Sequence, residues 1–355
     1  MSTVHSLLCS LQDWVVVIFL VLIGLVLSLQ VGPTFLRVMT LHGKLRQTGA
    51  NGRAASSSKY SHQRNNASPI WQIFRCISEG EYWMVPKQRF LHFYVVGTIS
   101  LVMGIYFSSS AVVNTAATSP NETTAWFWWW WKGQEQQQQL QQQPSPSLQL
   151  LVAPGLLLLH ILRRWYECLY VHQWRSTSLM HFSAYLVGIF YYAILPFMVC
   201  HFSRSICGNN IKDTEKRHQT VHAPFETMIP ESIPSLIQIG CVILCLYAQQ
   251  QQARHHSILA TLRLRQTNEK QRQIILYQLP EGGWFPWVAC PHYLAEILFY
   301  LGLAGLVPDL TRGAILLVWV VVTLTTNALQ SQKWYQENIP GYAQRNRKAI
   351  FPLLL

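Results

Sequence analysis

Long apolar runs alternate with polar segments along the whole chain. A helix needs roughly 20 apolar residues to cross the hydrocarbon layer of a membrane, and seven runs approach or reach that length. The first run is too long for a signal-peptide core, so we interpret it as an uncleaved span. The pattern predicts an all-α membrane protein with about seven transmembrane helices, at 14–36, 90–112, 147–162, 179–202, 233–249, 293–307 and 314–330.

Composition supports the membrane class. Of the 355 residues, 50% are hydrophobic and only 12% are charged. A soluble domain carries roughly 25% charged residues, so a single water-soluble enzyme is excluded. The net charge of +12 fits either a nucleic-acid partner or basic loops at a membrane face. The positions of the cations decide between these two interpretations.

The basic residues lie mainly in alternate loops. Segments 37–89, 163–178, 250–290 and 331–355 hold nine, three, five and four Lys or Arg, whereas 113–146, 203–232 and 308–313 hold one, four and one. Because cytoplasmic loops are enriched in Lys and Arg, the bias predicts a lumenal N-terminus and a cytosolic C-terminus. The glycosylation sequon at Asn121 then falls in a lumenal loop, and the one at Asn66 is cytosolic and unused. A nucleic-acid partner is not needed to explain the charge.

Three features of the sequence receive no chemical role. Trp126–Trp131 and the Gln-rich stretch Gln134–Gln143 are low in complexity and lack a helical or strand period. The eight cysteines form no CxxC pair and mostly fall in apolar runs, so neither a zinc site nor a disulfide framework is expected.

Ionisable residues cluster where the predicted spans meet the cytosolic side. Such groups are costly in or beside a membrane and are candidates for function, although snorkelling anchors and topogenic charges are the simpler alternatives. Glu296 stands out because it follows His292 by four residues, on one helical face inside an apolar run. No further ligands have matching spacing, so no metal is expected. The four clusters are Lys87–Tyr94, Arg163–His172, Arg254–Glu296 and Lys333–Lys348.

Soluble nucleotide-binding and acyl-transfer signatures are absent from the sequence. There is no GxGxxG after a strand, no GxxxxGK[ST] and no GxSxG. Any nucleotide would therefore be held by Arg, Lys and Tyr side chains of the cytosolic loops.

Several blocks carry a resemblance to a known family. The sequence LPEGGWFPWVACPHYLAE at 279–296 resembles the steroid 5α-reductase family and, within it, the polyprenol/polyprenal reductase branch. RRWYECLYV at 163–171, VPKQRFLHFYVV at 85–96 and the tail from Tyr335 to Pro352 are similar to the same branch. The resemblance implies seven helices that enclose NADPH and an apolar substrate. It divides the chain into a first helix and basic cytosolic loop (1–89), helices 2–4 with a Gln-rich lumenal insert at 113–146 (90–202), and an NADPH-binding region (203–355).

The resemblance also implies site residues. His292 replaces an amide-bearing residue of the steroid enzymes, and a tail histidine of the family is unmatched, so Lys333 is its candidate substitute. The carboxylate that helps to clamp the substrate carbonyl in the steroid enzymes is missing. Candidate donors to that carbonyl are Tyr166, Lys87 and His92. Implied cofactor contacts are His256, Arg263, Tyr277, His292, Glu296, Lys333 and Tyr335, and Arg347 and Lys348 are further candidates for the cofactor's 2′-phosphate.

The implied activity is NADPH-dependent reduction of the double bond nearest the head of a polyprenyl chain, in the endoplasmic reticulum membrane, for dolichol synthesis and protein glycosylation. Hydride addition to an α,β-unsaturated aldehyde places charge on the carbonyl oxygen, where a preorganised donor stabilises it. An allylic alcohol offers no such acceptor, so polyprenal is favoured over polyprenol. The alternatives are a 3-oxo-Δ4-steroid reductase and, from another class, a non-catalytic scaffold or transporter, although neither internal repeats nor matching broken spans are evident.

Overall fold

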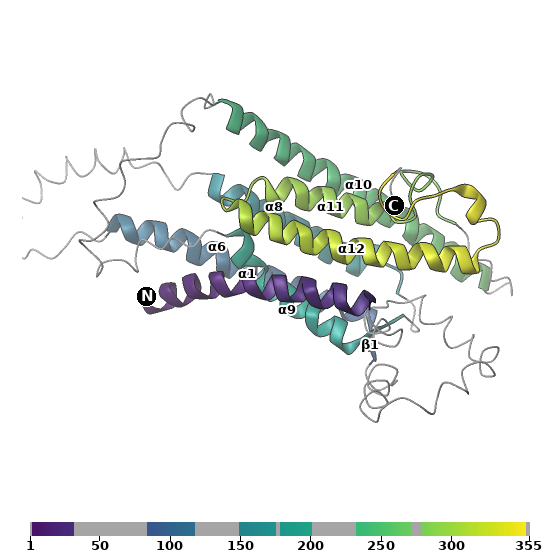
Figure 1. Cartoon of the computed structure of the whole chain (residues 1–355), viewed down its shortest axis with the longest axis horizontal. Helices are drawn as coiled ribbons and strands as arrows, with labels where there is room; N and C mark the ends of the chain where they lie inside the picture. Colours follow the sequence, from purple (N-terminus) through teal and green to yellow (C-terminus); the bar gives the residue numbers. More distant parts are fainter. Residues whose placement is uncertain are drawn as a thin grey trace, which may run out of the picture.

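The computed structural model describes residues 2–31, 84–117, 149–174, 178–200, 232–270 and 279–352. In these ranges seven α-helices lie side by side in an elongated bundle, and the two termini point toward opposite ends of it (Figure 1). The helices are α1 (Ser2–Val31), α6 (Phe90–Ala117), α8 (Gln149–Tyr166), α9 (Phe182–Val199), α10 (Ser232–Lys270), α11 (Pro291–Ala304) and α12 (Leu310–Asn338).

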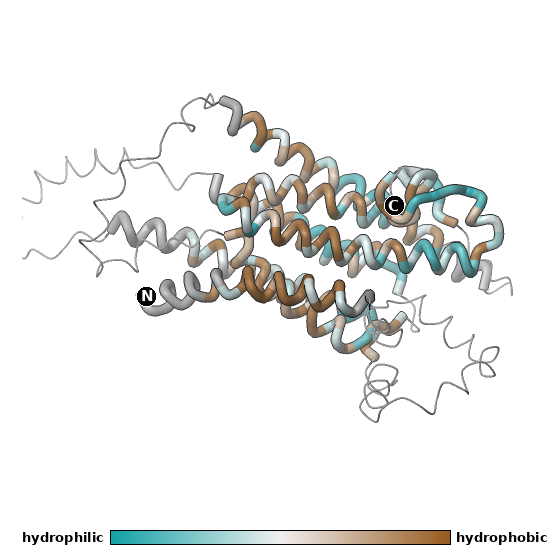
Figure 2. The backbone as a smooth tube through the Cα atoms, in the orientation of Figure 1, coloured by the Kyte–Doolittle hydropathy of each residue, from teal (hydrophilic) through white to brown (hydrophobic). Residues whose placement is uncertain are grey.

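The helices carry the composition of a membrane protein. Among the described residues, Lys87–Ser108, Phe182–Val199 and Leu310–Asn338 are long and apolar enough to span a membrane, and Trp14–Ser28 is a shorter apolar stretch. Hydrophobic residues fill the middle of the bundle (Figure 2). Hydrophilic residues gather at the end of the bundle where α12 ends, which we call the polar end. The chain is thus a mostly helical membrane protein, while seven crossings and their orientation stay predictions.

Several helices extend beyond their apolar runs, and α1 already begins at Ser2, well before the predicted span at 14–36. The segment 250–290 was expected to be a loop, but α10 continues through it to Lys270. Gln, Ala, Arg and Leu dominate this extension and have high helix propensity, so the helix does not end where the apolar run ends. In the same way α12 continues to Asn338. The polar ends of both helices are therefore helical and not loops.

A small β-element departs from the purely helical prediction. Strands β1 (Met84–Pro86) and β2 (Leu179–His181) pair antiparallel, with Met84 opposite His181. They join the segments that enter α6 and α9, and the 3₁₀ turn η2 (Lys87–Arg89) follows β1 directly. Three-residue strands carry too little alternation to be recognised in a sequence.

Close packing of α10 on α11 sets the geometry of the polar end. A Cβ atom on Gly302 of α11 would lie 2.8 Å from the backbone oxygen of Cys241 and 2.8 Å from the Cys245 sulfur of α10. Small residues at helix contacts let backbones approach closely, as they do in membrane bundles. The two helices are consequently fixed side by side over the stretch that carries their polar residues.

Several predictions fall outside the described residues. They concern the Trp-rich and Gln-rich segment, both glycosylation sequons and Tyr277.

Candidate functional site

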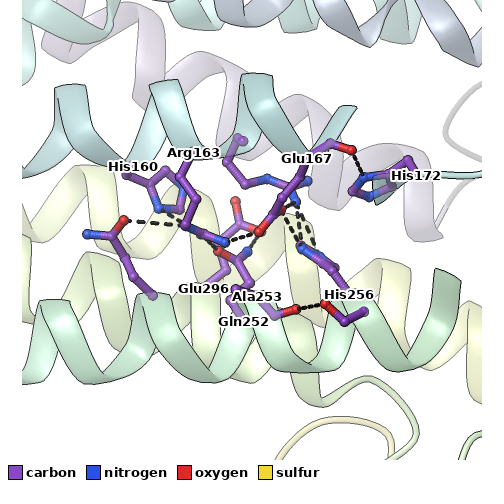
Figure 3. A network of polar contacts seen from close by, with 11 residues as sticks. His160, Arg163, Glu167, His172, Gln252, Ala253, His256 and Glu296 are labelled. Carbon is purple, nitrogen blue, oxygen red and sulfur yellow. Dashed lines mark hydrogen bonds and ion pairs between the residues drawn. The ribbon is translucent and has the colours of Figure 1, made fainter. Parts of the chain in front are cut away.

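A polar network crosses the interface between α8, α10 and α11 (Figure 3). His160, Arg163 and Arg164 lie near the end of α8 and Glu167 follows directly after it; the two arginines lie three and four residues from both His160 and Glu167, so the four side chains share one side of the helix. The α10 partners Gln249, Gln252 and His256 show the same spacing, and α11 contributes Glu296. The spacing of these residues therefore places the polar side chains of α8 and α10 on the helix faces that meet in the network, and Glu296 of α11 joins them.

Glu167 is the central anion of the network. It begins the π-helical turn η3 (Glu167–Val171), and its side chain is only 4% exposed. Its Oε1 accepts a hydrogen bond from Arg163, and its Oε2 accepts one from Nη1 of Arg164 at 2.6 Å. A buried carboxylate is tolerated only with such partners. The two guanidinium groups and the carboxylate thus stabilise one another.

His256 joins α10 to the same carboxylate. Its Nδ1 lies 2.7 Å from Oε2 of Glu167 and 2.8 Å from Nη1 of Arg164. An arginine can only donate and a carboxylate can only accept, so Nδ1 serves one of the two. We assign its proton to the bond with Glu167, because a charge-assisted bond to a carboxylate is the stronger one.

Glu296 lies inside the bundle and is held by a glutamine. Its Oε2 accepts a hydrogen bond of 2.9 Å from Nε2 of Gln252. The Oε1 atom of Gln252 accepts in turn from Arg163. A hydrogen-bonded chain therefore runs from Glu167 through Arg163 and Gln252 to Glu296.

Histidine rings surround this chain. The His256 ring lies 5.2 Å from that of His172 and 5.5 Å from that of His292, measured between centroids. His160 stacks on Phe299 at 4.2 Å. Nδ1 of His292 and Nε2 of His160 are buried without a hydrogen-bond partner. In the described part of the chain, no three His, Cys, Asp or Glu residues are grouped as a metal site would need.

His172 lies just beyond η3, outside the predicted spans. Its Nδ1 lies 2.8 Å from the backbone oxygen of Glu167. Burial, reinforced by the nearby charge of Arg164, lowers the pKa of His172 to about 4. The ring is therefore neutral at physiological pH and adds no positive charge to the network.

A loop between α10 and α11 closes over the polar end. The backbone N–H of Trp284 donates to Nε2 of His255 at 3.2 Å. Gly283 has φ +54°, and a Cβ atom there would lie 2.8 Å from the same nitrogen. Gly283 is thus required by both the left-handed backbone and the histidine beneath it, and Gly282 by its φ of +90°.

The C-terminal segment holds this loop in place. Arg347 is buried and donates to the backbone oxygen of Pro280 at 2.9 Å, while the backbone of Lys348 pairs with Val288. Arg345 and Glu281 form an exposed ion pair of 2.7 Å, and this hydrogen bond holds the pKa of Glu281 below its usual value. Burial lowers the pKa of Arg347 and raises that of Tyr342 to about 12.

The residues predicted to bind a cofactor separate into two groups. His256, His292 and Glu296 lie in or beside the network, and Arg263 donates to the backbone oxygen of Gln173 at 3.4 Å. The second group lies around the C-terminal segment. Within it the ring of Tyr335 packs 5.3 Å from that of Tyr342, Arg347 binds the loop, Lys348 is exposed, and Lys333 is 76% exposed and pairs with Glu337 at 3.9 Å.

The predicted donors to a substrate carbonyl are less close to one another. Tyr166 is 59% exposed beside Tyr170, and His92 is exposed with its Nδ1 2.8 Å from the hydroxyl of Tyr185. Lys87 lies inside the polar end, near enough to Arg263 for their charges to interact. Tyr94, which is not one of the predicted donors, is only 5% exposed, and the guanidinium of Arg164 lies 5.7 Å from the centre of its ring.

Sequence reasoning gave no role to several members of the network, His160 among them. Glu167 and Tyr94 were noticed in clusters but given no role. Gln249 and Gln252 belong to a run of four glutamines on α10, and only these two of the four are buried. The spacing of three and four residues, from Arg163 to Glu167 and from Gln249 to His256, is a signal of a shared helical face, but it does not select these residues on its own.

Comparison with known proteins adds to this geometry. Residues 220–355 match the family of 3-oxo-5-alpha-steroid 4-dehydrogenases. A polyprenal reductase of Caenorhabditis elegans is 28% identical over 277 residues, which are 76% of this chain and 80% of that protein. Polyprenal reductase 2 of Arabidopsis thaliana is 27% identical over 76% of this chain and 82% of that protein. The polyprenal reductase of Saccharomyces cerevisiae is 33% identical over 50% of this chain and 54% of that protein.

Proposed function

We propose that this chain, whose residues 220–355 match the 3-oxo-5-alpha-steroid 4-dehydrogenase family, is an NADPH-dependent polyprenal reductase of the endoplasmic reticulum membrane. It is an oxidoreductase that acts on a carbon–carbon double bond. Its substrate is the α,β-unsaturated aldehyde of a long polyprenyl chain, and its product is dolichal, which feeds dolichol synthesis for protein glycosylation.

The charged network inside an apolar bundle supports this proposal most strongly. Two arginines and two glutamates lie between α8, α10 and α11, in a bundle whose helices α6, α9 and α12 are long and apolar enough to span a membrane. Ionisable groups at such positions are costly to insert and mark binding or catalysis. An apolar bundle with one polar end suits a substrate that has a long hydrocarbon tail and a small polar head.

The residues at the polar end fit NADPH. Nδ1 of His292 is a buried polar atom without a partner, and Glu296 has a second oxygen beyond the one that Gln252 occupies. Arg263, Arg347 and Lys348 bring positive charge for phosphates, with Tyr335 as a further contact. Tyr277, outside the described residues, stays a candidate from the sequence. Lys333 stays a candidate, although its side chain is mostly exposed. When bound, the cofactor supplies a hydride to the β-carbon of the enal.

The chain's own residues then stabilise the substrate. The carbonyl oxygen gains negative charge as the β-carbon is reduced, and a preorganised hydrogen-bond donor lowers the barrier most at that atom. Lys87 and Tyr94 lie at the polar end of the bundle and are our first candidates, with Tyr166 and His92 as the others. The apolar walls exclude water, which strengthens any such hydrogen bond.

The test is a product analysis with purified protein in nanodiscs. Polyprenal, polyprenol and testosterone are incubated separately with NADPH, and the lipid products are identified by mass spectrometry. We expect dolichal from polyprenal and little turnover of the other two. Preferential reduction of testosterone would replace the proposal with a 3-oxo-Δ4-steroid reductase, which the name of the matched family also allows. No reduction of any enal would contradict the proposal.

A further inference from the structure

The direction of each hydrogen bond around Gln252 is fixed by its neighbours. Arg163 can only donate, so the atom of Gln252 that faces it must be the carbonyl oxygen. The amide nitrogen of Gln252 consequently faces Glu296, and it donates to Oε2 at 2.9 Å. Reversal of this amide would bring its NH₂ group against the guanidinium. Gln252 is therefore held in one orientation, as its labelled neighbours in Figure 3 indicate.

The orientation of Gln252 is itself anchored. Arg163 is bound to Glu167, whose carboxylate is 4% exposed and also takes bonds from Arg164 and His256. Gln252 is completely buried, so water does not compete for its amide. The donor that reaches Glu296 is thus preset before any ligand enters the site.

We infer that Gln252 is a positioning residue that occupies one oxygen of Glu296 and leaves the other, Oε1, as the acceptor for a donor group of the bound cofactor. This inference rests on the proposed function. A carboxylate free to rotate would present either oxygen in several directions. One preset bond fixes the plane of the carboxylate, so less freedom is lost when the cofactor binds.

A carboxylate and an amide can exchange places in this pair. In Gln252→Glu, two carboxylates face each other and the donor is lost. In Glu296→Gln, an amide faces the Gln252 amide, and its free end can present NH₂ instead of an oxygen. In the double variant, the amide at position 296 donates to the carboxylate at position 252, and its oxygen again faces the ligand. The double variant also keeps the total charge of the wild-type pair.

The experiment measures NADPH binding to the full-length protein in nanodiscs, by titration and by the rise in melting temperature that NADPH causes. Each single variant should raise the Kd of NADPH about tenfold or more, and the double variant should return it to within about threefold of wild type, since contacting residues are coupled. Gln250→Glu makes the same substitution at an exposed position of α10 and should leave the Kd unchanged.

Two results would overturn the inference. If the double variant binds NADPH as weakly as the two single effects combined, the exchange of donor and acceptor does not matter. If the variants lower the melting temperature of the free protein while the Kd of NADPH is unchanged, Gln252 only stabilises the bundle. A wild-type protein that binds no NADPH would contradict the proposed function itself, and the inference would fall with it.

Discussion

The carboxylate of Glu167 lies 2.7 Å from Nδ1 of His256, and this contact ties the end of α8 to the middle of α10 across 89 residues of sequence. Both side chains are almost completely buried. Because Arg163 and Arg164 bind the same carboxylate, one acidic group organises two cations and a histidine. Its removal should therefore affect the whole polar end of the bundle.

We predict that Glu167→Gln lowers both stability and NADPH affinity. It leaves two partly buried guanidinium groups without their counter-ion; breaking a fully buried pair costs about 3–5 kcal/mol, so this is the upper limit of the expected loss. Thermal unfolding and the KM of NADPH are the measurements. Asp309→Asn is the matched control, because Asp309 pairs with Arg312 at the start of α12, close to the end of α9. It should lower the melting temperature without a change in KM, and an equal effect of both variants on KM would contradict the role of Glu167.

The second prediction separates buried from exposed tyrosines. If Tyr94 donates to the substrate carbonyl, Tyr94→Phe should lower kcat about 10²–10³-fold, as the loss of an oxyanion donor does elsewhere. Tyr166→Phe should have little effect, since Tyr166 is 59% exposed. Steady-state kinetics with polyprenal provide the comparison. The opposite ranking would restore Tyr166 as the donor.

The third prediction concerns cofactor choice. We expect kcat/KM to favour NADPH over NADH by at least about tenfold, which corresponds to about 1.4 kcal/mol. Lys348→Gln should reduce this preference if Lys348 binds the 2′-phosphate, and Lys333→Gln should reduce it if Lys333 does so instead. Both lysines are exposed, so the melting temperature should stay unchanged. Equal use of the two cofactors by the wild-type protein would be evidence against the phosphate site.

The fourth prediction concerns Gly283, the glycine of the loop that lies over His255. Gly283→Ala should destabilise the protein by about 1–2 kcal/mol or more, because φ is +54° and a Cβ atom would press on His255. Gly155→Ala in α8 has nothing within 4 Å of the new atom and should be neutral or stabilising. Melting temperatures of the two variants test this difference. If Gly283→Ala melts at the wild-type temperature, the loop adopts another conformation.

The fifth prediction concerns orientation. Glycosidase treatment should shift the electrophoretic mobility of the wild-type protein but not that of Asn121→Gln. Asn66→Gln is the control and should behave like wild type, since its sequon is predicted to face the cytosol. Glycan at Asn66 would reverse the predicted orientation.

The apolar runs by themselves determined the helical membrane class and the approximate position of every described helix. Hydropathy reports burial in lipid, and a membrane-spanning backbone has to satisfy its own hydrogen bonds, so local sequence is sufficient for this conclusion. The same local logic placed Glu296 and His292 on one face of a helix. The apolar pattern did not predict where α10 ends, because polar residues of high helix propensity extend this helix to Lys270.

The tertiary structure alone decided which polar residues meet. Glu167, Gln252 and Glu296 are separated by up to 129 positions, and only the close packing of α10 on α11 and beside η3 brings them together. Nothing local distinguishes Gln252 from the other glutamines of its run, since its role follows from Arg163 on one side and Glu296 on the other. A hydrogen bond depends on distance and direction between two partners, and a sequence supplies the partners without either.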